Sequence, residues 1–137
     1  MAECIFAKNS LYHLNGIIRV LKVAEDSCLC IDCIRQTMPK WMPFSDLENA
    51  SPCGEDELPP IRALDSLGAE ERKVAQERYT LIAGILPNLG NSKARAEAIR
   101  QSAQENSLSR KTITNYLCAY LSYQSIAVLA VSAEAIL

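Results

Sequence analysis

One cluster of cysteines in this sequence has the residue types of a metal site. Cys28, Cys30 and Cys33 lie close together, and Cys53 or His13 could supply a fourth zinc ligand. Only Cys30 and Cys33 have the spacing of a common zinc knuckle, and no second pair follows. In a β-strand, Cys28 and Cys30 would share one face and Cys33 would point to the other. We therefore interpret these cysteines as buried residues of a hairpin, and we expect no metal and no cofactor.

Other residue patterns that support catalysis are missing from the sequence. His13 is the only histidine, and no serine or cysteine stands in a recognisable nucleophile arrangement with it. The glycines form no phosphate-binding loop. The acidic run from Glu55 to Asp65 lacks the helical or strand spacing of a metal site. We therefore predict no catalytic residues and a chain that is not an enzyme.

Basic and hydroxyl side chains gather near the end of the sequence. Residues 91–124 contain five basic and two acidic residues, whereas residues 46–71 contain eight acidic residues and one basic residue. The formal net charge of -2 hides this asymmetry. Arginine and lysine at a helix N-terminus can reach phosphates or a guanine edge, and asparagine can pair with adenine. The candidate DNA-binding residues are Ser109, Arg110, Lys111, Thr112, Thr114, Asn115, Lys93 and Arg95.

Three helices are predicted to position these side chains. Ser66 is the candidate N-cap of the first helix, whose apolar stripe consists of Ala75, Tyr79, Ile82 and Leu86. Asn91 or Ser92 is predicted to cap a second helix that runs to about Gln104. Ser109 is predicted to cap a third helix from Arg110 to about Tyr120. The tail 126–137 could form a fourth helix that packs on the others.

The segment from Ala94 to Tyr120 has the layout of a helix-turn-helix. Ala96 and Ala103 are predicted to let the two helices cross closely, and Leu108 is predicted to close the turn. The residues expected to face inward are Ile113, Tyr116, Leu117 and Tyr120. The residues expected to face outward are Arg110, Lys111, Thr114 and Asn115. A solvated three-helix bundle remains the alternative interpretation of this pattern.

The front of the chain is predicted to form short strands. Residues 16–23 alternate, with Ile17, Leu21 and Val23 on one face and Ile18 and Val20 on the other. A polar turn leads into a second hairpin arm over residues 27–33, and residues 40–44 could add an edge strand. Between residues 47 and 60 the prolines and glycines are expected to break any regular element.

Three segments resemble the N-terminal part of Mu-type DDE transposases: AEERKVAQERYTLI (69–82), ARAEAI (94–99) and LSRKTITNYLCAYL (108–121). Such transposases typically carry a helix-turn-helix ahead of the catalytic domain, and some begin with a short β-rich segment. The similarity extends from near Ser10 to near Ala130. It implies that transposon-end DNA contacts Ser109, Arg110, Lys111, Thr112 and Asn115. The family's turn usually has a glycine where Ser107 stands, so Asn106 or Ser107 must adopt any left-handed conformation here.

A catalytic domain of this family would need three carboxylates that hold two metal ions. The chain of 137 residues has no room for that separate domain.

These observations predict an α+β chain with a small β-rich N-terminal subdomain (1–46), an acidic linker rich in proline and glycine (47–65) and a helical domain with the helix-turn-helix (66–137). The predicted function is sequence-specific binding of double-stranded DNA, at transposon ends, by a region that lacks the catalytic domain. The alternative is a protein-protein interaction module without DNA binding. Other transposition proteins and further copies of this chain, in a homo-oligomer, are candidate partners. No membrane partner and a cytoplasmic location are expected, because no apolar stretch is long enough to span a bilayer and the first residues do not resemble a signal peptide.

Overall fold

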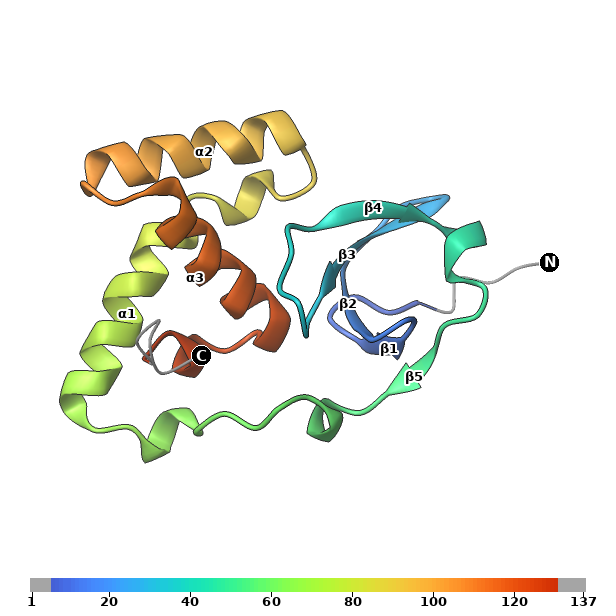
Figure 1. Ribbon diagram of the computed structural model, residues 1–137, viewed down its shortest axis with the longest axis horizontal. Helices are drawn as coiled ribbons and strands as arrows, with labels where there is room; N and C mark the ends of the chain where they lie inside the picture. Colours follow the sequence, from blue (N-terminus) through green and yellow to red (C-terminus); the bar gives the residue numbers. More distant parts are fainter. Residues whose placement is uncertain (1–5, 131–137) are drawn as a thin grey trace.

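The structure is a computed structural model that describes residues 6–130. A five-stranded antiparallel sheet is followed by three helices, which confirms the predicted α+β fold with a β-rich N-terminal part. The sheet forms one half of the molecule and the helices form the other (Figure 1). In the spatial order β4-β3-β2-β1-β5, the strands are β1 (Leu11–His13), β2 (Ile17–Val23), β3 (Ser27–Asp32), β4 (Lys40–Pro43) and β5 (Ser51–Cys53).

The predicted hairpin forms between β2 and β3, and β4 follows it at one edge of the sheet. Ile17 and Leu21 lie in the core that includes the helices, whereas Ile18 and Val20 lie in a second core. This alternation is the one predicted from the sequence. Val23, expected on the same face as Leu21, is instead 38% exposed, because the strand pairing shifts register just after Val20.

Two further strands, β1 and β5, are present that the sequence analysis does not predict. β1 pairs with β2 across a turn in which Asn15 and Gly16 both have positive φ, a conformation that Asn-Gly adopts readily. β5 then pairs with the other side of β1. The expectation that residues 47–60 contain no regular element is therefore wrong at β5. Pro52 is tolerated there because β5 is an edge strand.

The helices α1 (Ala69–Ala83), α2 (Ser92–Glu105) and α3 (Arg110–Tyr123) form over the predicted segments. Leu86, predicted on the apolar stripe of the first helix, instead begins a separate 3₁₀ turn after α1. The side chains of Asn91 and Ser109 cap α2 and α3, as expected. Ser66 does not cap α1, because it belongs to a separate 3₁₀ turn, η3 (Leu64–Ser66). The carboxylate of Glu71 instead accepts a hydrogen bond from the backbone N–H of Gly68, the residue before α1.

Short 3₁₀ turns complete the described chain: η1 (Phe44–Leu47), η2 (Glu55–Glu57), η4 (Leu86–Asn88) and η5 (Ile126–Ala130). The predicted fourth helix over 126–137 begins as η5, and its remainder lies outside the described residues. Within residues 6–130, no helix is long and apolar enough to cross a membrane.

One face of the sheet and the three helices share a single apolar core. Its buried residues include Leu11, Ile17, Leu21, Leu29 and Ile31 from the strands and Ile82, Ile99, Ile113 and Leu117 from the helices. The second core contains Tyr12, Ile18, Val20, Cys28, Cys30 and Leu47. Strands this short bury too little apolar surface to be stable alone, so the sheet needs the helices to complete its core.

A buried arginine joins the sheet to the end of α3. Arg19 on β2 is 2% exposed, and its Nε donates to the carbonyl of Ser122 at 2.9 Å. Its guanidinium also donates to both carboxylate oxygens of Glu55 at 2.8 Å and to the carbonyl of Asn9 at 2.6 Å. The last carbonyls of a helix have no partner within it and carry the negative end of its dipole. Arg19 satisfies this helix end, and Glu55 neutralises the buried charge.

Replacement of Arg19 by methionine should lower the free energy of unfolding by about 3 kcal/mol, because the Ser122 carbonyl and Glu55 lose their buried donor. Urea unfolding followed by circular dichroism measures this change. Arg35→Met is the matched control: Arg35 is 73% exposed and pairs with Asp32 at 3.5 Å, so its effect should stay within about 0.5 kcal/mol. Equal small effects of the two substitutions would refute the role given to Arg19.

The same ion pair predicts how stability falls in acid. The hydrogen bonds from Arg19 hold the pKa of Glu55 below its usual value. Because the folded-state pKa is the lower one, the stabilisation is complete above the unfolded pKa of about 4.3 and is lost as the pH falls through the folded-state pKa. The free energy of unfolding should therefore fall less steeply below about pH 5 in Glu55→Gln than in the parent. Parallel profiles would contradict this role of Glu55.

Candidate nucleic-acid interface

The exposed part of the predicted helix-turn-helix is the N-terminal end of α3. Its predicted contact side chains are exposed at Arg110, Lys111 and Asn115 and half-buried at Thr112 and Thr114. The hydroxyl of Ser109 accepts a hydrogen bond from the backbone N–H of Thr112 at 3.1 Å and lies 2.9 Å from the Thr112 hydroxyl. The other N–H groups of a first helical turn have no partner within the helix. This helix end therefore adds the positive end of its dipole to two cationic side chains.

The turn between α2 and α3 is closed by backbone hydrogen bonds. The N–H of Ser107 donates to the carbonyl of Gln104, and the N–H of Leu108 donates to that of Ala103, which is the Schellman pattern. Ser107 has φ +55°, the left-handed conformation predicted for Asn106 or Ser107. The prediction that the Leu108 side chain closes the turn is wrong, since this side chain is 39% exposed.

Contact between α2 and α3 is limited to part of α2. Of the two small residues predicted to allow a close crossing, Ala103 is buried, whereas Ala96 is exposed. In Figure 1, α3 leaves the turn at a steep angle to α2, so the first half of α2 extends past the crossing. The prediction for Ala96 is therefore wrong, and Ala103 with the neighbouring Ile99 forms the packed face.

The rest of α3 lies between α1 and the sheet (Figure 1). Its buried residues are Ile113, Leu117, Cys118, Ala119, Leu121 and Ser122. Tyr116 and Tyr120, expected to face inward, are half-buried against α1. The ring of Tyr120 packs edge-to-face on Tyr79 at 5.3 Å, and the guanidinium of Arg78 lies 5.0 Å from the centre of the Tyr116 ring. The exposed part of α3 is therefore its end next to the turn.

Lys93 and Arg95 lie in the first turn of α2, at the opposite end of that helix from the turn to α3. Lys93 is exposed, whereas Arg95 is half-buried and its Nη1 donates to the carbonyl of Leu89 at 2.8 Å. Burial lowers the pKa of Arg95. The six candidates between Ser109 and Asn115 therefore lie together at the start of α3, whereas Lys93 and Arg95 lie apart from them at the start of α2.

The cysteine cluster is buried in the sheet. Cys28 and Cys30 lie in the second core, and Cys33 lies in the core shared with the helices, as the strand alternation predicts. Burial raises the pKa of the Cys30 thiol to about 12 and that of the Cys33 thiol to about 11. Cys28, Cys30 and Cys33 are each at most 2% exposed and are divided between the two faces of the sheet, so they cannot surround one metal ion. This arrangement supports their interpretation as packing residues.

The two residues considered as additional zinc ligands lie together elsewhere. His13, Cys53 and Glu57 form the one group of described residues whose potential ligand atoms all lie within 4.8 Å of one another. Sequence reasoning missed Glu57, which lies in the segment assigned to the linker. The Asn15-Gly16 pair was the available signal, because it predicts a hairpin that would place His13 on a strand.

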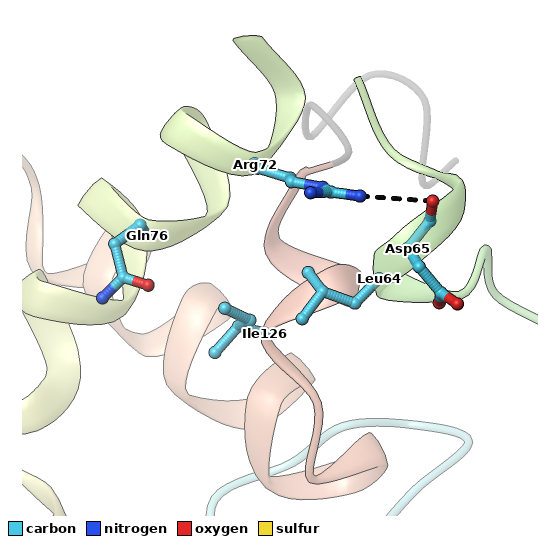
Figure 2. Close-up of a pocket in the computed structure, with 5 residues that line it drawn as sticks. All are labelled: Leu64, Asp65, Arg72, Gln76 and Ile126. Atoms are coloured by element: carbon cyan, nitrogen blue, oxygen red, sulfur yellow. Dashed lines mark hydrogen bonds between the residues drawn. The ribbon is translucent and has the colours of Figure 1, made fainter. Parts of the chain in front are cut away.

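A hollow between α1, η3 and η5 is one of the concave features near the helices. Figure 2 shows Leu64 and Ile126 along its floor, with Arg72 and Gln76 reaching over it from α1. Nη2 of Arg72 donates to the backbone carbonyl of Asp65 at 3.2 Å. This contact ties the segment before α1 to the helix. The hollow therefore offers apolar surface next to a cation that is already engaged.

In comparisons with known proteins, no family model matches the chain, and no curated protein matches it either. Function is therefore inferred from the exposed residues of the structure and from the resemblance described for the sequence. The residues that this geometry favours are Ser109, Arg110, Lys111 and Asn115, which lie on one helix end and outside both apolar cores.

Substitutions at Ser107 test the conformation of the turn that orients the N-terminal end of α3. Ser107→Gly should raise the free energy of unfolding by about 0.5–1 kcal/mol, because glycine adopts positive φ without a Cβ clash. Ser107→Ala keeps a Cβ and loses the hydroxyl, so it should not stabilise the protein. Thermal unfolding of both variants measures the difference. A destabilising Ser107→Gly would contradict the left-handed conformation.

Proposed function

We propose that the chain binds double-stranded DNA through the helix-turn-helix formed by α2, the turn after it and α3. The observation that carries the proposal is the capped and exposed N-terminal end of α3, where Arg110, Lys111 and Asn115 stand together. Helix-turn-helix proteins contact base edges with the N-terminal residues of their second helix. The burial of the remainder of α3 is compatible with this mode, because the contacts require only that end.

Each exposed side chain has a chemical role in the proposed complex. Asn115 can pair bidentately with adenine, and Arg110 can pair bidentately with guanine. Lys111 and the N–H groups of the first turn of α3 suit a backbone phosphate. The first helix of a helix-turn-helix crosses the DNA backbone, and there Lys93 at the start of α2 would meet a second phosphate.

The proposed target is the end of a transposon. This part of the proposal is supported by the resemblance of residues 69–82, 94–99 and 108–121 to the N-terminal part of Mu-type transposases. Strand transfer would then be carried out by a separate catalytic domain, and this chain would supply recognition alone. The basic excess of residues 91–124 is modest, with five basic and two acidic residues, so non-specific affinity should be weak and discrimination must come from the base contacts.

A protein-interaction module is the second candidate. The apolar hollow between α1, η3 and η5 favours this second function, because an apolar side chain of a partner could pack against Leu64 and Ile126 (Figure 2). Such a partner would bind away from the N-terminal end of α3. Its affinity would therefore be insensitive to substitutions at Arg110 and Lys111.

The DNA proposal can be tested by fluorescence anisotropy with random and transposon-end duplexes over a series of salt concentrations. Binding should weaken as salt rises, since phosphate contacts release counterions. Removal of both cations in the double variant Arg110→Ala, Lys111→Ala should make the slope of log K against log[salt] shallower by about 1–2. Asn115→Ala should reduce the preference for the specific duplex by about 1–3 kcal/mol and leave the salt slope unchanged.

The matched control is the double variant Arg35→Ala, Lys73→Ala. Both residues are exposed, neither lies on α2 or α3, and their removal changes the net charge by the same amount. The salt slope of this control should stay close to that of the parent. Identical losses in the two double variants, or no binding by the parent, would refute the proposed interface.

A further inference from the structure

The pairing of β1 with β5 brings a histidine and a cysteine onto one face of the sheet edge. In this antiparallel pair, His13 lies opposite Ser51 and Leu11 lies opposite Cys53. Directly opposed residues share a face, and so do residues two apart on a strand. His13 and Cys53 are therefore diagonal neighbours on the face that carries Leu11.

A carboxylate completes the group. Glu57 is the last residue of η2, which follows β5 after Gly54. Its Oε1 lies 2.8 Å from Nε2 of His13, and its Oε2 accepts a hydrogen bond from the backbone N–H of Gly54 at 2.8 Å. The Gly54 contact orients the carboxylate and leaves the other oxygen directed at the imidazole. Metal sites use this kind of supporting hydrogen bond to orient their ligands.

We propose that His13, Cys53 and Glu57 form a zinc-binding site at this edge of the sheet. Their ligand atoms all lie within 4.8 Å of one another, and tetrahedral zinc requires separations of about 3.3–3.8 Å. Small side-chain rotations close this difference. A set of one nitrogen, one sulfur and one oxygen suits zinc, whereas magnesium and calcium prefer oxygen alone.

The surroundings favour a cation. Asp56 adds a carboxylate next to Glu57, whereas Glu55 is engaged by Arg19. Burial and the hydrogen bond with Glu57 raise the pKa of Cys53 to about 11, so zinc must displace the proton of this thiol. On binding, Cys53 coordinates as the thiolate and releases its proton to solvent. To coordinate through Nε2, His13 must give up the Nε2 proton that faces Glu57 and hold a proton on Nδ1 instead, which leaves the Nε2 lone pair free for the metal. Each side chain of the His13–Glu57 pair is 44% exposed, which leaves the fourth zinc position to water.

Bound zinc would fasten the segment after β5 to the N-terminal strand. That segment carries Glu55, the partner of the buried Arg19. A metal that holds Cys53 and Glu57 on β1 would therefore hold Glu55 in place as well. This consequence is independent of DNA binding, because none of these residues lies on α2 or α3.

Titration of the full chain with cobalt and zinc tests the site. Cobalt should produce the near-ultraviolet absorption of a thiolate-metal bond, and this absorption should vanish in Cys53→Ser. Competition with a chromophoric chelator should show that His13→Ala, Cys53→Ser and Glu57→Gln each weaken zinc binding at least about tenfold. Zinc should also raise the unfolding midpoint of the parent, because a ligand that binds the folded state stabilises it.

Two control variants distinguish coordination at this site from attraction to nearby acidic charge and from binding at the buried cysteines. Asp56→Asn removes a neighbouring acidic charge without removing a proposed ligand, and it should bind zinc nearly as the parent does. Cys30→Ala tests the buried cysteine cluster, and it too should retain zinc binding. Circular dichroism checks that every variant folds. Absence of cobalt absorption in the parent, equal losses in Asp56→Asn and Glu57→Gln, or binding that requires Cys30 and not Cys53 would overturn the proposal.

Discussion

The structure depends on the position of one buried charge, the guanidinium of Arg19. A cation at 2% exposure is tolerated only where it is paired and hydrogen-bonded, and each nitrogen of the Arg19 guanidinium donates here. Here the acceptors are the carbonyls of Asn9 and Ser122 and the carboxylate of Glu55. They come from the N-terminal segment, the end of α3 and the stretch after β5. One side chain therefore fixes three distant parts of the chain against β2.

This constraint divides α3 into two parts with different tasks. The C-terminal part, with Leu117 and Leu121, is packed on the sheet and on α1, and the carbonyl of Ser122 accepts a hydrogen bond from Arg19. The N-terminal part carries Arg110, Lys111 and Asn115 in solvent. Residues that stabilise the fold and residues proposed to contact DNA are thus separated along the same helix. Such separation lets the contact residues change with little cost in stability.

Local patterns explain what could be predicted from the sequence. The caps at Asn91 and Ser109 and the alternation along β2 each involve neighbouring residues, and all three are present in the structure. Pairing between remote segments has no comparable local pattern. Pro52 argued against a strand at 51–53, yet β1 supplies an edge on which that strand forms. The grouping of His13 with Glu57 and the partners of Arg19 follow from this pairing, so neither could be derived before the topology was known.

The contact between Arg19 and Ser122 spans 103 positions of the chain. During synthesis, β2 leaves the ribosome long before α3 is made. Until then Arg19 remains solvated and the helix-facing side of the sheet remains exposed. The sheet can reach its final packing only after the chain has emerged beyond Ser122. A chain that lacks α3 would expose Leu11, Ile17 and Leu29 together with unpaired strand edges. Exposed apolar surface of this kind promotes aggregation and is bound by chaperones. Bringing Arg19 and Ser122 together closes a long loop of chain. The chain loses this conformational entropy before the stabilising contacts form, which favours slow folding.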